Sequence, residues 1–410
     1  MLNLKKNTSK AARITLWLPL LISFAPLAML VYLIRPIFLL RFHGLNARKI
    51  GHYAEEVELY LCEMAHGINR PNLIYWDIFF HDIGPVCNKQ LEKMWRRKIS
   101  IYPKILIKPM LMLTHLFPRG GINRIGNNTQ YNRDVNNLYD KISSQIEFTS
   151  KEISYGMSVL EKMGLKEKKY ACIDVRDSAY ANNVLKVDNF RDQYRDSNID
   201  NYYEAALKII EKGYVVVRMG KSVNSQFPVK NANIIDYANS TYRSDFMDLF
   251  LAAHCDFTLS GCGGFSAVPI IFRRPFAFVN MAPIGLSVTF RDSTIGICKH
   301  YCDSRTHKRL TFKEILKRNA AYLTDTKDYI EANIYLEENS PVEIMEVAEE
   351  MILQIEGKLK HSSESNYAQE KFRDIFPKDQ IVIPNMNRQH GKIKFKYGSK
   401  FLLDNPHFLN

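Results

Sequence analysis

Short apolar runs that alternate with helical patterns limit, more than any other feature, what this 410-residue chain can fold into. After residue 160, "YACIDV", "YVVVRM", "DFTL" and "PFAFVN" are typical of buried strands, and "NYYEAALKIIEKG" and "DFMDLFLAAHC" carry apolar residues at helical spacing. A repeated strand–helix–strand order indicates parallel strands with helices on both faces. We therefore expect an α/β fold with a doubly wound parallel sheet.

A weaker copy of the pattern precedes this block, where "PIFLLRF" and "NLIYWDIFF" lie on either side of the helical "HYAEEVELYLCEM". The sequence thus predicts two Rossmann-like domains. The expected segments are an N-terminal membrane anchor at 1–35, a first α/β domain at 36–160, a second at 161–330, and a helical and basic extension at 331–410. Within the extension, polar residues from Lys358 to Glu370 predict a flexible connection.

The first of these segments is uncharged from Ile14 to Ile34, a run of 21 residues that is long enough for the hydrocarbon core of a bilayer. We predict an uncleaved anchor, because the run exceeds the apolar part of a usual signal peptide and ends in "RPIFLLRF" rather than at small residues. A cleaved signal peptide is the alternative, since basic residues precede the run. Pro19 and Pro26 disfavour a straight helix, so an in-plane or re-entrant segment stays open.

The charge balance indicates anionic partners, since 56 Lys and Arg against 43 Asp and Glu give a formal net charge of +13. Between Lys89 and Arg133, ten basic residues and one acid, Glu92, are mixed with apolar side chains. Such a segment suits docking on anionic lipid, and a solvated basic face or a substrate loop are the alternatives. Nucleic acid is not expected as a partner, because the basic residues do not lie on a groove-fitting helix.

The seven cysteines form no CxxC pair, which favours a reducing compartment over a disulfide framework. The tightest group is "CKHYC", from Cys298 to Cys302 with His300 between them. A structural zinc site needs four ligands, and no second pair lies nearby to complete one. We expect free thiols here and no metal.

Polar residues follow three of the expected strands, and the carboxyl ends of parallel strands meet at one edge of a sheet, where ligands bind. "YACIDV" is followed by "RDS", "YVVVRM" contains an arginine near its end, and "DFTL" leads into "SGCGGFS". The residues expected at this edge are Arg176, Asp177, Arg218, Ser260, Gly261, Gly263, Gly264 and Ser266.

These residue types are suited to a diphosphate. Glycines let backbone N–H groups approach an oxyanion, a helix expected to begin near Phe265 would add its positive end, and arginine binds phosphate with two N–H groups. Two alternatives stay open: the glycines allow only close packing of helix on strand, and Arg176 and Arg218 are structural partners of Asp177 and Asp245. The fingerprints GxGxxG, Walker A and HExxH and a Ser-His-Asp order are absent from the sequence.

Several stretches resemble a family of putative bacterial glycosyltransferases of surface-polysaccharide synthesis. They are "RFHGLNARKIGHYAEEVELYL", "CIDVRDSAY", "GYVVVRMG", "IIDYANSTYRSDFMDLFLAAHCDFTLSGCGGFSAVPIIF" and "YGSKFLLDNPHFL". The resemblance implies a GT-B fold with two facing domains, the nucleotide-sugar donor on the second, the acceptor on the first, and no essential metal or other cofactor. Arg176 is also placed as in the arginine motif of fucosyltransferase-type enzymes, which implies contact with the nucleotide diphosphate. Cys262 and Gly263 replace the small hydroxyl residues expected in the loop.

The expected function is therefore transfer of a sugar from a nucleotide-diphosphate donor to a glycan or lipid-linked acceptor, at the bacterial inner membrane with the catalytic domains facing the cytoplasm. His52, at the start of the first domain's helix, is the candidate base, with Glu55 and Glu56 as alternatives and Asp177 available from the donor side. A helix cap or acceptor contact is the other interpretation of His52. The rival function is a membrane-tethered, non-catalytic protein that binds nucleotide-sugar or glycan during assembly.

Overall fold

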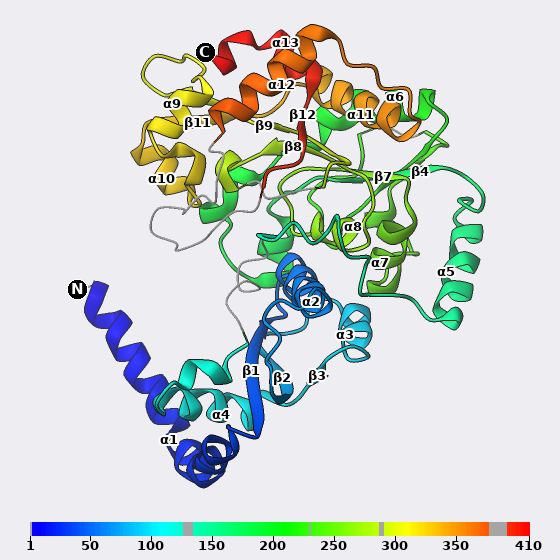
Figure 1. The fold of residues 1–410 in the computed structure, drawn as a ribbon. Coiled ribbons are helices and arrows are strands. Elements are labelled where there is room, and N and C mark those ends of the chain that lie inside the picture. Colours follow the sequence, from blue (N-terminus) through cyan, green and yellow to red (C-terminus); the bar gives the residue numbers. More distant parts are fainter. Residues whose placement is uncertain (1, 126–133, 229–230, 287–290, 377–391) are drawn as a thin grey trace. The chain divides into compact units, whose positions relative to one another are not determined.

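A computed structural model describes residues 2–125, 134–228, 231–286, 291–376 and 392–410 (Figure 1). Contacts along the chain divide it into two compact units, Met1–Gln130 and Tyr131–Asn410. The division lies earlier than the boundary expected after residue 160, because helix α5 (Ser150–Lys162) packs on the second unit. Gly156 on this helix lies directly against the ring of Phe250, where a side chain would collide.

The first unit contains a three-stranded parallel sheet in the order β1-β2-β3. Its strands are β1 (Phe38–Asn46), β2 (Ile74–Ile83) and β3 (Ser100–Ile101). Its helices after the first are α2 (Ile50–Ala65), α3 (Lys89–Trp95) and α4 (Lys104–Leu116). The predicted strand–helix–strand unit at residues 36–80 is confirmed by the parallel pairing of β1 with β2.

The chain begins with helix α1 (Leu2–Ile34), which contains Pro19 and Pro26. Within the residues that the structure describes, its segment Trp17–Ile34 is the one helical stretch that is long and apolar enough to cross a membrane. Figure 1 shows that the axis of α1 changes direction, as expected for a helix that lacks backbone hydrogen bonds at its prolines.

The second unit is built on a seven-stranded parallel sheet in the order β12-β9-β8-β7-β4-β5-β6. The strands are β4 (Tyr170–Asp174), β5 (Val215–Arg218), β6 (Ile234–Ile235), β7 (Phe257–Ser260), β8 (Phe276–Met281), β9 (Thr294–Cys298) and β12 (Lys396–Tyr397). Helices cover both faces (Figure 1), so the predicted doubly wound α/β sheet is confirmed.

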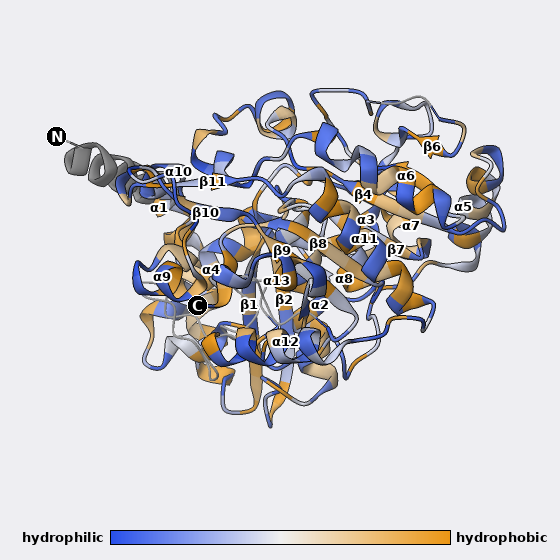
Figure 2. Ribbon diagram, turned by 90° about the horizontal axis from the view of Figure 1, so that it is seen from above, coloured by the Kyte–Doolittle hydropathy of each residue, from blue (hydrophilic) through white to orange (hydrophobic). Residues whose placement is uncertain are grey.

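One face of this sheet packs on α5 and α7 (Asp245–His254), and their buried residues form one core with those of β4 and β5. The other face carries α6 (Tyr203–Glu211) and α11 (Pro341–Ile355). Figure 2 shows hydrophobic and hydrophilic residues on the same helix, for example α6 and α7, as expected for helices with one buried face. The remaining elements are α8 (Ala267–Ile271), β10 (His300–Asp303), α9 (Phe312–Lys317), α10 (Thr326–Glu331), β11 (Ile334–Glu337), α12 (Ser363–Ile375) and α13 (Ser399–Asp404).

The C-terminal segment is part of the sheet domain rather than a separate extension. Strand β12 pairs in parallel with β9 and forms an edge of the sheet, and its Tyr397 is fully buried. The flexible connection expected up to Glu370 is wrong from Ser363 onward, because α12 begins there and buries Phe372 against Phe312. An apolar face on this polar-looking segment explains the difference.

Candidate anion-binding site

The strand order of the second unit reverses between β4 and β7. From β4 the chain continues on one side to β5 and β6, and from β7 it continues on the other side to β8 and β9. Loops that leave two such neighbouring strands diverge, and the crevice between them is where ligands bind in open parallel sheets. Asp174 and Ser260 are the paired last residues of β4 and β7, so they mark this position.

Asp174 holds the glycine loop against the sheet. Its carboxylate accepts a hydrogen bond of 3.0 Å from the Ser260 hydroxyl, and its backbone carbonyl accepts one of 3.0 Å from the Gly261 N–H. A Cβ on Gly263 would lie 2.8 Å from Asp174 Oδ2, so only glycine fits there without a shift. Burial raises the pKa of Asp174 to about 6. Close packing thus explains Gly263.

Arg176, two residues beyond the end of β4, lies among polar side chains of the loop that follows. Its Nη2 donates a hydrogen bond of 2.9 Å to Asn189 Oδ1, and its Nε lies 3.1 Å from Asp196 Oδ1. Its ion-pair partner is therefore Asp196 and not Asp177. Burial, and then the neighbouring cation Arg195, lower the pKa of Arg176.

Two buried polar atoms at this edge, Arg195 Nε and Ser197 Oγ, have no hydrogen-bond partner. Arg176 Nε and Asp196 Oδ1 make no hydrogen bond either, but they face each other at 3.1 Å as an ion pair. Buried polar atoms are almost always satisfied, so the first two indicate a place where water or a ligand completes the hydrogen bonds. Arg195 Nε belongs to a guanidinium group, which favours an anion.

Lys299 adds a third cation to the edge, from the residue directly after β9. It is 4% exposed, and its Nζ donates a hydrogen bond of 2.5 Å to the Asp196 carbonyl. Burial lowers the pKa of Lys299, while Glu338 and the Cys262 thiol act in the opposite direction. Cys262 itself donates to the Ala282 carbonyl at 3.0 Å.

Sequence reasoning missed Arg195, Asp196 and Lys299. Lys299 obeys the rule that identified Arg176, since it follows a strand, but it was interpreted only as part of "CKHYC". Arg195 and Asp196 lie in the long connection between β4 and α6 and follow no strand, so no signal in the sequence marks them.

The structure does not bring Arg218 and Asp177 to the crevice as free groups. Arg218 is the last residue of β5, its side chain is 1% exposed, and its Nη1 lies 3.1 Å from Asp236 Oδ1. Asp177 accepts hydrogen bonds of 2.8 Å from the N–H groups of Ala179 and Asn224 and thereby fixes two loops to each other.

The rest of the glycine loop provides fewer groups for binding an anion than the sequence indicated. The Ser266 hydroxyl donates to the Gly263 carbonyl at 2.6 Å, and Gly264 is exposed. The helix after the loop, α8, contains only five residues and begins at Ala267. A helix this short contributes little dipole, so the charge at this edge comes from side chains.

In the first unit, His52 and Glu56 lie one turn apart on α2. His52 is 42% exposed, and its Nδ1 lies 3.7 Å from Glu56 Oε1. Glu56 is buried, accepts a hydrogen bond of 3.2 Å from the Asn46 N–H at the end of β1, and has a pKa raised to about 7 by burial. Glu55, on the same turn, is partly exposed.

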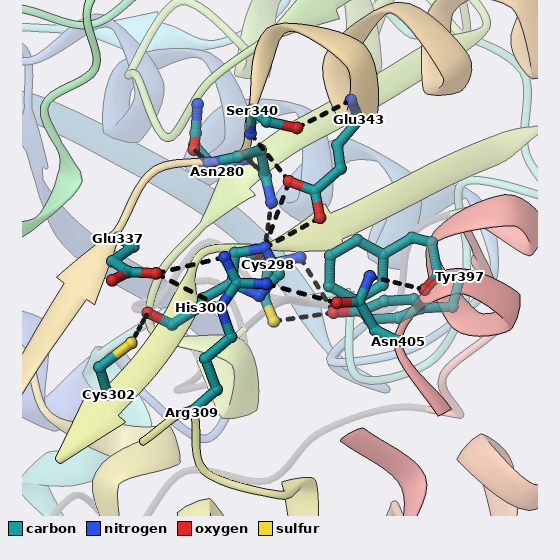
Figure 3. Close-up of polar contacts among 12 residues, drawn as sticks. Asn280, Cys298, His300, Cys302, Arg309, Glu337, Ser340, Glu343, Tyr397 and Asn405 are labelled. Atoms are coloured by element: carbon teal, nitrogen blue, oxygen red, sulfur yellow. Dashed lines mark hydrogen bonds and ion pairs between the residues drawn. The ribbon is translucent and has the colours of Figure 1, made fainter. Parts of the chain in front are cut away.

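The "CKHYC" residues have separate partners, as Figure 3 shows. Cys298 Sγ accepts a hydrogen bond of 2.8 Å from the Tyr397 hydroxyl, and His300 Nε2 lies 2.9 Å from Glu343 Oε1. Cys302 is a buried free thiol. Within the described ranges, no three His, Cys, Asp or Glu residues gather as metal ligands.

Comparison with known proteins gives structural likeness only. No family model and no curated protein match the sequence. A family 9 glycosyl transferase from Veillonella parvula is similar over 78% of this chain and 97% of its own, with a TM-score of 0.45 and 10% identity. E. coli ADP-heptose lps heptosyltransferase II is similar over 60% of this chain and 86% of its own, with a TM-score of 0.34 and 12% identity. An E. coli heptosyltransferase with ADP-2-deoxy-2-fluoro heptose is similar over 64% and 93%, with a TM-score of 0.33 and 11% identity. At these TM-scores the likeness supports no conclusion about function.

Proposed function

We propose that the protein is a glycosyltransferase that moves a sugar from a nucleotide-diphosphate donor to a glycan or lipid-linked acceptor in surface-polysaccharide synthesis. The observation that carries this proposal is the group of Arg176, Arg195 and Lys299 at the point where the strand order of a parallel sheet reverses, next to buried polar atoms without hydrogen-bond partners. Such a position is where parallel α/β sheets bind nucleotides. The resemblance of the sequence to putative glycosyltransferases supports the same reaction.

In the proposed reaction an acceptor hydroxyl attacks the anomeric carbon of the donor sugar. The bond from this carbon to the diphosphate oxygen breaks, and the leaving diphosphate keeps the electron pair. Arg176, Arg195 and Lys299 bind the diphosphate and stabilise the charge that grows on it, which is the role a divalent metal has in other enzymes. The donor therefore binds the second unit and transfer needs no metal.

The proton of the acceptor hydroxyl passes to a base on the first unit. His52 is the proposed base, and Glu56, whose Oε1 lies 3.7 Å from its Nδ1, stabilises the imidazolium when the carboxyl group is ionised. In this proposal the first unit therefore binds the acceptor. Arg218 and Asp177 already have partners within the donor unit, so the other three cations are the proposed donor contacts. Asp177 stays the alternative base on the donor side.

The proposed location is the bacterial inner membrane, with both units on the cytoplasmic side. The apolar segment of α1 and the resemblance of the sequence support it. Seven free cysteines are consistent with a reducing compartment.

The proposal is tested by a thermal-shift screen of the purified protein against UDP-, GDP-, CMP- and ADP-sugars in EDTA. A nucleotide that binds only the folded state raises the melting temperature by mass action, so the nucleotide that does so identifies the donor class. A transfer assay with that donor, also in EDTA, then separates an enzyme from a protein that only binds. No shift with any donor contradicts the proposal, and a shift without turnover favours the non-catalytic binding protein.

Arg176 gives the sharpest variant. Arg176→Ala is expected to lower kcat/KM by about 10²–10³-fold, because one preorganised contact to the leaving group is lost, and Arg176→Lys is expected to recover only part of it. Arg318→Ala is the matched control. Arg318 Nη1 lies 2.7 Å from Asp303 Oδ2, so this variant also breaks an Arg–Asp ion pair, but one that is not part of the crevice. If Arg176→Ala unfolds the protein while the lysine variant turns over normally, Arg176 has a structural role only.

A further inference from the structure

Helices α1 and α4 of the first unit both expose large apolar side chains. On α1, Leu18, Ile22, Met29 and Leu33 recur at helical spacing and are all exposed, Ile22 to 67%. On α4 the exposed apolar residues are Ile105, Leu106 and Leu116, the last to 79%. Monomeric soluble proteins rarely expose so much apolar side chain on two adjacent helices.

Helix α4 lies beside α1 along Trp17–Ile34, the segment of α1 that is long enough to span a membrane. The Tyr32 and Phe117 rings stack at 4.9 Å, and the Lys108 ammonium lies 5.9 Å from the Trp17 ring centroid. Between these ends, Ala28 and Val31 of α1 are buried in one core with residues of α4 and of the sheet, namely Phe42, Ile78 and Met110.

This packing fixes α1 to the folded unit, so α1 is not a separate anchor on a linker. If Trp17–Ile34 crossed a bilayer, α4 would enter the hydrocarbon with it. Lys104 and Lys108 on α4 pair with Asp82 at 3.0 and 2.6 Å at the end of β2. Ionised groups at membrane depth are costly, and a strand end carries backbone groups that lipid does not satisfy.

The charge around α4 is complementary to anionic lipid. Of the described residues from Lys89 to Ile125, nine are basic and one is acidic. Arg119 and Arg124, in the segment that follows α4, are exposed. Arg35, directly after α1, donates a hydrogen bond of 2.8 Å to the Pro118 carbonyl. The exposed aromatic residues Trp76, on β2, and Tyr102, two residues before α4, pack edge to face at 5.9 Å. Basic and aromatic residues beside an apolar face are typical of the lipid headgroup level.

We infer that α1 and α4 together form a platform that embeds in one leaflet of an anionic bilayer without crossing it, with α4 as a second membrane-contacting element. The inference rests on the membrane location in the proposed function but not on sugar transfer. Its failure would leave the nucleotide-binding test unaffected, and failure of that test would leave the platform unaffected.

The first test measures flotation of the full-length protein with vesicles of phosphatidylglycerol and phosphatidylcholine, against vesicles of phosphatidylcholine alone, at increasing lipid concentration. The double variant Ile105→Glu, Leu106→Glu is expected to lower the partition coefficient by about tenfold or more, because two side chains leave the apolar phase. The matched control is Ile330→Glu, Val342→Glu, which changes two exposed apolar residues of the second unit, Ile330 being 60% exposed.

Circular dichroism shows whether each variant is folded. If the double variant of α4 does not fold, Leu116→Glu at the other end of the helix is used in its place. The inference requires unchanged binding by the control and stronger binding of the wild type to the anionic vesicles. Unchanged partition of the α4 variants, equal loss by the control, or no preference for anionic lipid would overturn it.

The second test asks whether α1 crosses the bilayer. Protease-cleavable tags are placed at Met1 and after Asn410 of the full chain in sealed vesicles. A platform in one leaflet leaves both tags on the same side of the bilayer. In intact vesicles, protease is therefore expected to cleave the N-terminal tag to the same extent as the C-terminal tag. An N-terminal tag that is cleaved only after detergent is added would show a spanning α1 and overturn the inference.

Discussion

At the scale of single residues, Arg176 and Arg218 show that two residues of the same type can have different roles. Both come from neighbouring strands, and Ile173 of β4 pairs with Arg218 of β5. Arg218 is the last strand residue, and its buried guanidinium pairs with Asp236. Arg176 lies two residues beyond its strand, which brings its guanidinium to the edge beside Asn189 and Asp196.

This difference predicts that Arg218→Ala destabilises the protein. The Asp236 carboxylate would lose its cation and keep only the N–H donors of Phe227 and Asn239, so the free energy of unfolding should fall by about 3 kcal/mol, at the lower end for a broken buried pair. Urea denaturation measures it. Arg318→Ala, which breaks a more exposed pair, should cost at most about 1 kcal/mol. Unchanged stability of Arg218→Ala together with loss of nucleotide binding would make Arg218 a ligand residue instead.

Glu56 predicts a pH dependence of stability. Burial raises its pKa in the folded protein from 4.5 to about 7, so between these values the folded state holds a proton that the unfolded state has released. The contribution of Glu56 to stability is therefore largest below pH 4.5 and falls as the pH rises to about 7, by about 3 kcal/mol in total. The difference in unfolding free energy between wild type and Glu56→Gln, measured across this range, should show that slope. A flat difference would mean that water reaches the carboxylate.

At the scale of elements, the sequence predicts what local pattern controls. Apolar runs and helical periodicity identify β4, β5, β7 and β8 and the helices between them, because each of these elements buries its own face in the core. Strand β12 could not be identified, since two residues of "KYGSK" form it only when β9 is already in place. The same reason hides Arg195, which reaches the site through a long loop whose path depends on the folded sheet.

The role of β12 predicts the effect of a C-terminal truncation. Removing residues 392–410 takes away Tyr397, Phe401 and Phe408, which are all buried, at about 1.5–3 kcal/mol for each side chain. The sum is comparable to the whole stability of a typical domain, so the truncated chain should not fold. Tyr397→Phe is the control, because it keeps the ring and loses only the two hydrogen bonds between the hydroxyl and the Sγ and N–H of Cys298, at a cost of about 1–3 kcal/mol. A folded, cooperative truncated chain, seen by circular dichroism and melting, would show that the segment is a dispensable extension.

At the scale of the whole molecule, the two units have separate tasks. All three cations of the candidate site and the buried polar atoms beside them belong to Tyr131–Asn410, which has its own core. The candidate base, the apolar helices and most of the basic segment belong to Met1–Gln130. Donor binding and membrane contact are thus expected to be separable, whereas transfer requires both units.

A chain of residues 134–410 tests this division directly. Because every proposed donor contact lies within it, the fragment should bind the nucleotide-sugar found in the thermal-shift screen with a dissociation constant close to that of the full chain. It should show no transfer, since the acceptor side and His52 are missing, and no flotation with anionic vesicles. Arg176→Ala in the same fragment is the control that ties binding to the crevice at β4 and β7. Calorimetry measures the affinity. A folded fragment that does not bind while the full chain does would place part of the donor site on the first unit, and transfer by the fragment alone would remove His52 from the mechanism.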